Sequence, residues 1–184
     1  MRTEKILGII FIVGVFLKAF SLPGASVVLV VSLCLLALIY FFFSFYFFSV
    51  NGIKNQNLKL SIIAGIFYFF GVIGILFKLQ YWYGDKSNLA LGSLSSFIIL
   101  LIIIKQRNSN EYGLYYRNML IRGAFVFSLT TIFYLVPRET LLNIQYRNDP
   151  ELARLKMLYY SNPNNIEYKK QHDDYLRRRD SIKI

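Results

Sequence analysis

Two lysines lie inside apolar stretches, and each comes just before a glycine-containing turn. Lys18 lies in "GVFLKAFSLPGAS", and Lys78 lies in "GILFKLQYWYGDKS" sixty positions later. An ammonium group at the centre of a bilayer costs about 2.5–3.5 kcal/mol, so a lysine there needs an explanation. Three explanations stay open: the lysines snorkel to the headgroups as anchors, they donate hydrogen bonds to carbonyl groups freed at the turns, or they line an ion path.

Other groups capable of chemistry are few in this chain. An ion path usually supplies an acid partner inside the membrane, but the acid nearest to the two lysines is Asp85, in the second turn. Cys34 is the single cysteine and is predicted to be a small buried or lipid-facing side chain. His172 is the single histidine and is predicted to be solvated. We therefore predict no catalytic residue, no metal site and no cofactor, and no enzyme activity.

The apolar runs that hold these residues predict helices that cross a membrane. The chain has 184 residues, of which 55% are apolar, and its mean hydropathy of +0.45 is too high for a soluble chain of this size. A crossing helix needs about 20 mostly apolar residues. The predicted spans cover residues 6–22, 25–50, 60–83, 88–104 and 119–137, and the apolar core of the fifth begins only at Gly123.

These spans divide the chain into four parts. A first membrane hairpin covers 1–50, a second covers 60–104, a fifth helix covers 119–137, and a polar helical tail covers 138–184. In the tail, Asp149, Pro150 and Glu151 predict a helix start, and "SNPNN" separates it from a second charged helix. The net charge of +11 is spread over connectors and tail, which argues against a nucleic-acid partner.

The two hairpins resemble each other at a shift of sixty residues. The identical pairs include Ile6/Ile66, Gly14/Gly74, Lys18/Lys78, Gly24/Gly84 and Leu29/Leu89. Matched lysines and glycines in the same order predict a duplicated two-helix hairpin, that is, a parallel repeat. The predicted fold is thus an all-α membrane protein with tandem transmembrane hairpins, a fifth helix and a short helical tail.

The candidate structural or functional residues all belong to this repeat. They are Gly14, Lys18, Pro23, Gly24, Gly74, Lys78, Trp82 and Gly84. Gly14 and Gly74 lie one turn before each lysine, where a small residue lets helices approach closely. Trp82, with Tyr81 and Tyr83, predicts an aromatic belt at the membrane interface.

The distribution of Lys and Arg predicts the orientation. With a cytoplasmic N-terminus, the inner segments hold Arg2, Lys5, Lys54, Lys59, Lys105, Arg107, Arg117 and Arg122, whereas the two short outer turns hold only Lys86. Five spans then place the tail outside, in the periplasm of a bacterium. If 119–137 lies on the surface or re-enters the membrane instead, the tail is cytoplasmic.

The first hairpin resembles the N-terminal membrane domain of GldL, a gliding-motility and type IX secretion family with the phrase G-x-x-F-K-x-x-x-W-P-G-A-S. The first copy keeps Gly14, Lys18, Pro23, Gly24, Ala25 and Ser26, and the second keeps Gly74, Phe77, Lys78, Trp82 and Gly84. Leu36 and Ser96 stand where motor members of the family carry a glutamate, and the long coiled-coil extension of the family is absent. The resemblance implies a hairpin fold and a bacterial inner-membrane location, without a proton-driven motor.

The function that these observations favour is a non-catalytic, multi-pass protein of the bacterial inner membrane. It is a structural or assembly subunit that associates with itself or with another membrane protein, and the tail is its interaction module. The alternative is a small transporter or channel subunit, but its spans offer only scattered hydroxyl groups to line a path, among them Ser32, Ser93 and Thr130.

Overall fold

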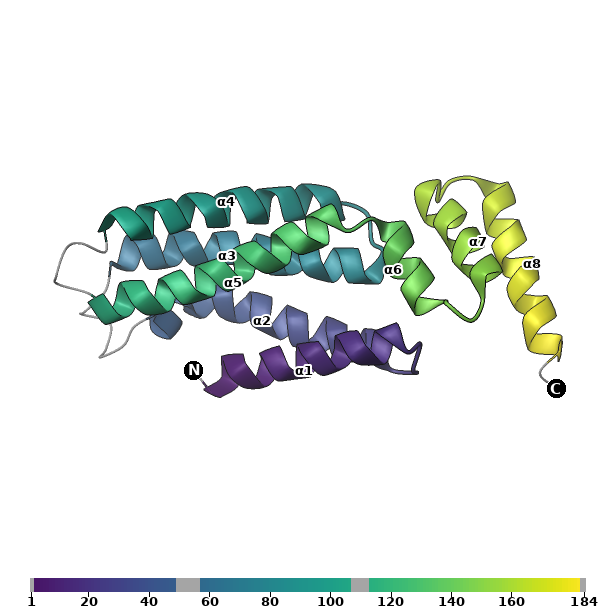
Figure 1. Cartoon of the computed structure of the whole chain (residues 1–184), viewed down its shortest axis with the longest axis horizontal. Helices are drawn as coiled ribbons and strands as arrows, with labels where there is room; N and C mark the ends of the chain where they lie inside the picture. The colour runs from purple at the N-terminus through teal and green to yellow at the C-terminus, as the bar shows by residue number, and fades with distance from the viewer. Residues whose placement is uncertain (1, 49–56, 107–112, 183–184) are drawn as a thin grey trace.

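The computed structural model describes residues 2–48, 57–106 and 113–182. Within these ranges the chain forms eight α-helices and no strand, so the all-α prediction is confirmed. Five long helices lie side by side, and three shorter ones lie beyond one end of this bundle (Figure 1). The long helices are α1 (Arg2–Ala19), α2 (Ala25–Phe48), α3 (Leu58–Gln80), α4 (Asp85–Gln106) and α5 (Gly113–Leu135). The shorter ones are α6 (Arg138–Gln145), α7 (Pro150–Ser161) and α8 (Ile166–Ile182).

Four of the described helices are long and apolar enough to cross a membrane. They are α2, as far as Ser44, and the whole of α3, α4 and α5. The 23 residues of α3 cover about 34 Å, which exceeds the roughly 30 Å of a hydrocarbon core. Large apolar side chains such as Phe16, Leu94 and Phe125 point away from the bundle, as expected for helices surrounded by lipid. The chain therefore has the composition of a multi-pass membrane protein.

The first predicted span does not reach this standard, whereas the fifth does. α1 carries Glu4 and Lys5 near its start and Lys18 near its end. The uncharged run between Lys5 and Lys18 covers only about 18 Å of helix. α5 begins at Gly113, earlier than the predicted 119, and it is continuous through Arg122. The charges of α1 thus make it the least typical of the five long helices.

α3 lies at the centre of the bundle. It packs against α2 on one side and α4 on the other, and it also contacts α5. Tyr68, Ala64 and Leu76 of α3 are buried in the common core. A Cβ added to Gly92 of α4 would lie 2.4 Å from the Cα of Gly71, so the backbones of α3 and α4 touch there. Small residues make this close approach of two helices possible.

The predicted boundaries hold in the tail and fail at the turns. α7 begins at Pro150, and the Asp149 side chain caps it by accepting a hydrogen bond from the amide of Leu152 at 3.1 Å, as predicted. α8 is the second charged helix that the sequence predicts. α6 is an additional helix, which was not predicted from the sequence. The predicted ends at 22 and 83 are wrong, because α1 stops at Ala19 and α3 stops at Gln80.

Both turns lie at the same end of the bundle as α6, α7 and α8 (Figure 1). This follows from the direction of the chain, because α1, α3 and α5 all run toward that end. The connectors that contain Lys54 and Arg107 lie outside the described residues, as do the last two residues of the predicted 1–50 hairpin. Whichever side of a membrane the turns face, a bundle of this form places the tail on that side.

Candidate functional site

The two turns have the same backbone conformation at a shift of sixty residues. Ser21 and Tyr81 have φ angles of 54° and 60°, and Gly24 and Gly84 have φ angles of 83° and 88°. A positive φ is strained for residues other than glycine, so its occurrence at two equivalent pairs is a specific match. The need for Gly24 and Gly84 is thereby explained by backbone geometry.

The hydrogen bonds of the two turns also correspond. In each turn the residue after the left-handed position donates to the helix five residues back, and the fourth residue after the glycine donates to the glycine carbonyl. The pairs are Leu22 to Leu17 at 2.9 Å with Trp82 to Phe77 at 2.9 Å, and Val28 to Gly24 at 3.1 Å with Asn88 to Gly84 at 3.1 Å.

Gly14 and Gly74 make equivalent contacts inside their hairpins. A Cβ on Gly14 would lie 2.9 Å from the side chain of Leu29, and a Cβ on Gly74 would lie 2.8 Å from the backbone nitrogen of Leu89. Leu29 and Leu89 are themselves sixty residues apart and both are completely buried. The close approach expected at these glycines is therefore present in both hairpins.

The second turn holds a buried cluster of charges. Arg138 donates two hydrogen bonds to the Asp85 carboxylate, at 2.6 and 3.2 Å, and a third to the carbonyl oxygen of Trp82 at 2.8 Å. The Nζ of Lys78 lies 3.6 Å from Oδ2 of Asp85, and these two residues are only 1% and 3% exposed. A forked guanidinium contact of this kind fixes both distance and direction. The cluster therefore joins the end of α3, the start of α4 and the start of α6.

The first turn has different polar chemistry around its lysine. Ala25 stands where the second turn has Asp85. Lys18 donates instead to Oε1 of Gln80 at 3.2 Å, and its Nζ lies 5.1 Å from the centre of the Tyr81 ring. Gln80 in turn donates to the carbonyl oxygen of Ser26 at 3.2 Å. Lys18 thus connects the first hairpin to the second.

The contacts of Lys18 and Lys78 bear on each of the three explanations: the anchor, the donor to turn carbonyls and the ion path. Both lysines are buried in protein, so neither has the exposed head of a snorkelling anchor. Their described partners are side chains rather than turn carbonyls. The acid that an ion path requires comes from the turn, as Asp85. Arg138 was not foreseen, because only the path of α5 brings it to the second turn.

Of the other candidate residues, Pro23 and Trp82 are exposed in their turns. Trp82 and Tyr83, which is 94% exposed, lie on the surface, as the predicted aromatic belt requires, whereas Tyr81 does not. Tyr81 is buried, stacks on Tyr160 of α7 with ring centres 5.2 Å apart, and donates to Oε1 of Gln145 at 3.0 Å. Burial raises the pKa of Tyr81 above its usual range, so its hydroxyl stays protonated as a donor.

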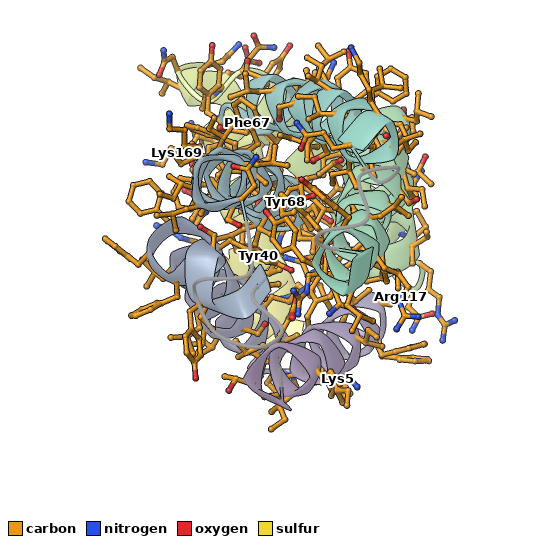
Figure 2. All side chains as sticks on the ribbon, turned by 90° about the vertical axis from the view of Figure 1, so that its left-hand side faces the viewer. Lys5, Tyr40, Phe67, Tyr68, Arg117 and Lys169 are labelled. Carbon is orange, nitrogen blue, oxygen red and sulfur yellow. The ribbon has the colours of Figure 1, made fainter. Side chains whose placement is uncertain are left out.

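A second polar cluster lies deeper in the bundle. Glu4 accepts a hydrogen bond from the Tyr40 hydroxyl at 2.7 Å and pairs with Arg122 at 2.9 Å. Counting helix residues back from the turns places these side chains about 20 Å below that end. Figure 2 shows Tyr40 and Tyr68 within the ring of helices and Lys5 and Arg117 at its rim. Arg122 is therefore a bundle residue, which corrects its place among the inner interfacial charges.

The single cysteine and histidine also have defined places. Cys34 is half-buried against the core of the bundle. His172 is not solvated as predicted: its ring stacks on Tyr159 with centres 5.5 Å apart, and its Nδ1 lies 3.0 Å from Asp173. No group of three or more His, Cys, Asp or Glu side chains that could hold a metal ion occurs in the part of the chain that the structure describes.

No family model, curated protein or solved structure matches the chain. The GldL resemblance therefore stays a prediction. At the positions of the family's glutamate, Leu36 lies in α2 and Ser96 lies in α4, where it is completely buried.

Proposed function

We propose that this chain is a non-catalytic, multi-pass subunit of a membrane assembly and that its tail is the interaction module. The supporting observation is how the tail is held. Arg138 binds the second turn through Asp85, and Tyr81 binds both Gln145 of α6 and Tyr160 of α7. A tail that is fixed at its base can present α8 in a defined direction beyond the bundle (Figure 1).

α8 is the outermost helix of that tail. Among the described elements its main contact is with α7, and Lys169, Lys170 and Arg177 are among its exposed side chains. A charged helix with an open face is suited to binding a polar partner surface. The partner in this proposal is a second copy of the chain or another membrane protein.

The membrane hairpins are proposed to be a duplicated unit in tandem. Four features that occur twice support this proposal: the left-handed residue, the turn glycine, the turn hydrogen bonds and the glycine–leucine contact. A GldL-like origin and a bacterial inner membrane belong to the same proposal. Outside the tail, Lys and Arg are more frequent at the end opposite to the two short turns, which hold only Lys86, and this supports a cytoplasmic N-terminus and a periplasmic tail. Arg138, Arg147, Arg154 and Lys156, in the first part of the tail, count against that orientation.

One observation favours a small transporter as the second candidate. The ion pair of Glu4 and Arg122 lies within an apolar bundle, and ionisable groups at membrane depth often mark transport paths. Against this, the pair is closed by the Tyr40 hydroxyl, and the guanidinium and carboxylate are only slightly exposed.

Photo-crosslinking in native membranes tests the assembly proposal. A photoreactive phenylalanine replaces Lys169 of α8, and a matched control replaces Leu94, which is exposed on the apolar face of α4. We expect a discrete protein adduct from position 169 and lipid adducts alone from position 94. Absence of a protein adduct at 169, together with solute flux in proteoliposomes that the Arg122→Leu variant lacks, would favour the transporter.

A further inference from the structure

A cleft of about 1000 Å³ lies between the second turn and the tail. Residues 83–87 of the turn form one wall, 134–138 at the end of α5 form the second, and 157–164 at the end of α7 form the third. This volume is at the upper end of the roughly 300–1,000 Å³ that small-molecule sites occupy. The cleft is therefore large enough for a ligand of the size of a lipid headgroup.

The charge that faces this cleft is positive. Lys78, Lys86 and Arg138 line it, and Asp85 is the acid among its lining residues. Arg138 already satisfies both oxygens of Asp85 with hydrogen bonds. One carboxylate cannot neutralise three cations, so the cleft keeps an excess of positive charge that suits an anion.

Lys78 adds its charge to the inner wall of this cleft. An ammonium group has three N–H donors. Its described charged partner, Asp85, lies at 3.6 Å, beyond the usual 2.7–3.2 Å of an N–H···O bond. Lys78 is also 1% exposed, so it acts on an anion in the cleft through its charge rather than through an open surface contact. Its charge strengthens the attraction of an oxyanion to Lys86, the exposed lysine of the same cleft.

The position of the cleft indicates the kind of anion. It opens at the end of two helices that are apolar enough to span a membrane, α4 and α5. Tyr83 and Leu135 at its edge are 94% and 71% exposed. Exposed aromatic residues at a span end lie at headgroup level. Farther along the same two helices, Leu94 and Ile132 are exposed apolar side chains.

We propose that this cleft binds a phosphate-bearing anion, and that the anion is the headgroup of an acidic phospholipid. The phosphate lies against Lys86, attracted also by the buried charge of Lys78, and the acyl chains lie along α4 and α5. The site would hold the tail and the bundle together through a lipid. This proposal does not depend on the assembly function, because it concerns the inner face of the tail rather than α8.

Native mass spectrometry of the full chain in detergent tests this site. The protein is titrated with anionic phosphatidylglycerol and, in a separate series, with phosphatidylcholine, which has no net charge. The number of bound lipids is counted in each series. The variants are Lys86→Gln and Lys86→Glu, and the matched control is Lys59→Gln, an exposed lysine in the first turn of α3 at the other end of the bundle. One basic residue near an anionic headgroup contributes about fivefold in affinity.

We expect the tightest phosphatidylglycerol to bind about fivefold more weakly in Lys86→Gln, and more weakly still in Lys86→Glu. Lys59→Gln should leave that binding event within about twofold. A separate arm adds inorganic phosphate: displacement of the lipid at millimolar concentration identifies a free phosphate site, and no displacement identifies the lipid headgroup. Equal binding of phosphatidylcholine, or equal losses in Lys86→Gln and Lys59→Gln, would overturn the proposal.

Discussion

The two turns of this protein have one backbone and two sets of polar contacts. Each has a left-handed residue, a glycine with φ above 80° and a lysine at the end of the preceding helix. In the second turn the lysine faces Asp85, and Arg138 of the tail completes the cluster. In the first turn Ala25 replaces the acid, and Lys18 reaches across to Gln80.

The difference shows which features make the turn and which make the connections. The shared glycines and backbone hydrogen bonds are sufficient to build both turns, since both are built without a common charge pair. Asp85 serves a separate purpose, because it attaches the tail to the second hairpin. Gln80 serves another, because it attaches the first hairpin to the second. Both turns have the lysine, but the partner of the lysine differs between them.

The largest expected effect comes from giving the second turn the chemistry of the first. Asp85→Ala leaves the buried Lys78 and the partly buried Arg138 without their carboxylate, and breaking a buried ion pair in this way typically costs about 3–5 kcal/mol. We expect the free energy of unfolding, measured in detergent by denaturant titration, to fall by that amount. Asp85→Ala with Lys78→Met should recover part of the loss. A loss below about 1 kcal/mol in Asp85→Ala would mean that the cluster is not a structural connection.

The next effect distinguishes the two glycine contacts. A Cβ at Gly74 would meet the backbone of Leu89, which cannot move away, whereas a Cβ at Gly14 would meet the flexible side chain of Leu29. Overpacking costs about 1–3 kcal/mol. We expect Gly74→Ala to show a loss in that range in the same unfolding measurement, and Gly14→Ala to lose less. The reverse order would contradict the description of these contacts.

The turn glycines should behave alike. Gly24 and Gly84 both have positive φ angles, so Gly24→Ala and Gly84→Ala each introduce a strain of about 1–2 kcal/mol. Similar losses in melting temperature for the two variants would support a shared backbone conformation in the two turns. A large difference would show that the two turns tolerate strain differently and would weaken the proposed duplication.

The smallest effect is expected at Lys18. Lys18→Met removes a hydrogen bond to Gln80 and a cation–π contact with Tyr81. These contacts are worth about 1 kcal/mol in total, and part of that is regained by not burying an ammonium group. Insertion and melting temperature should therefore remain close to those of the original chain. Loss of solute transport in Lys18→Met, with normal insertion, would instead support the ion path.

Local patterns made much of this fold predictable. The length of the apolar runs predicted the four described helices that are apolar enough to span a membrane. The start of α7 at Asp149 and Pro150 was predicted from its capping chemistry. The helix ends at the turns were placed too late, because residues such as Tyr81 continue the apolar pattern although their backbone leaves the helix. The spacing of apolar residues does not indicate where a residue adopts a left-handed backbone conformation.

The contacts of the candidate site were harder to predict. Lys78 and Gly74 were identified from their spacing, but Arg138 and Gln145 reach the turns only through the packing of α5 and α6. Glu4 pairs with Arg122 from the far end of the sequence. Long-range pairs of this kind have no local signature in a single sequence.

Cysteine accessibility tests most directly the central claim that the turns and the tail share one side of the membrane. In a Cys34→Ala background, single cysteines replace Tyr83 in the second turn, Ile166 at the start of α8, and Lys59 at the start of α3. Intact cells are treated with a membrane-impermeant maleimide. We expect Tyr83→Cys and Ile166→Cys to react alike and Lys59→Cys to behave in the opposite way. Opposite labelling of Tyr83→Cys and Ile166→Cys would contradict that claim.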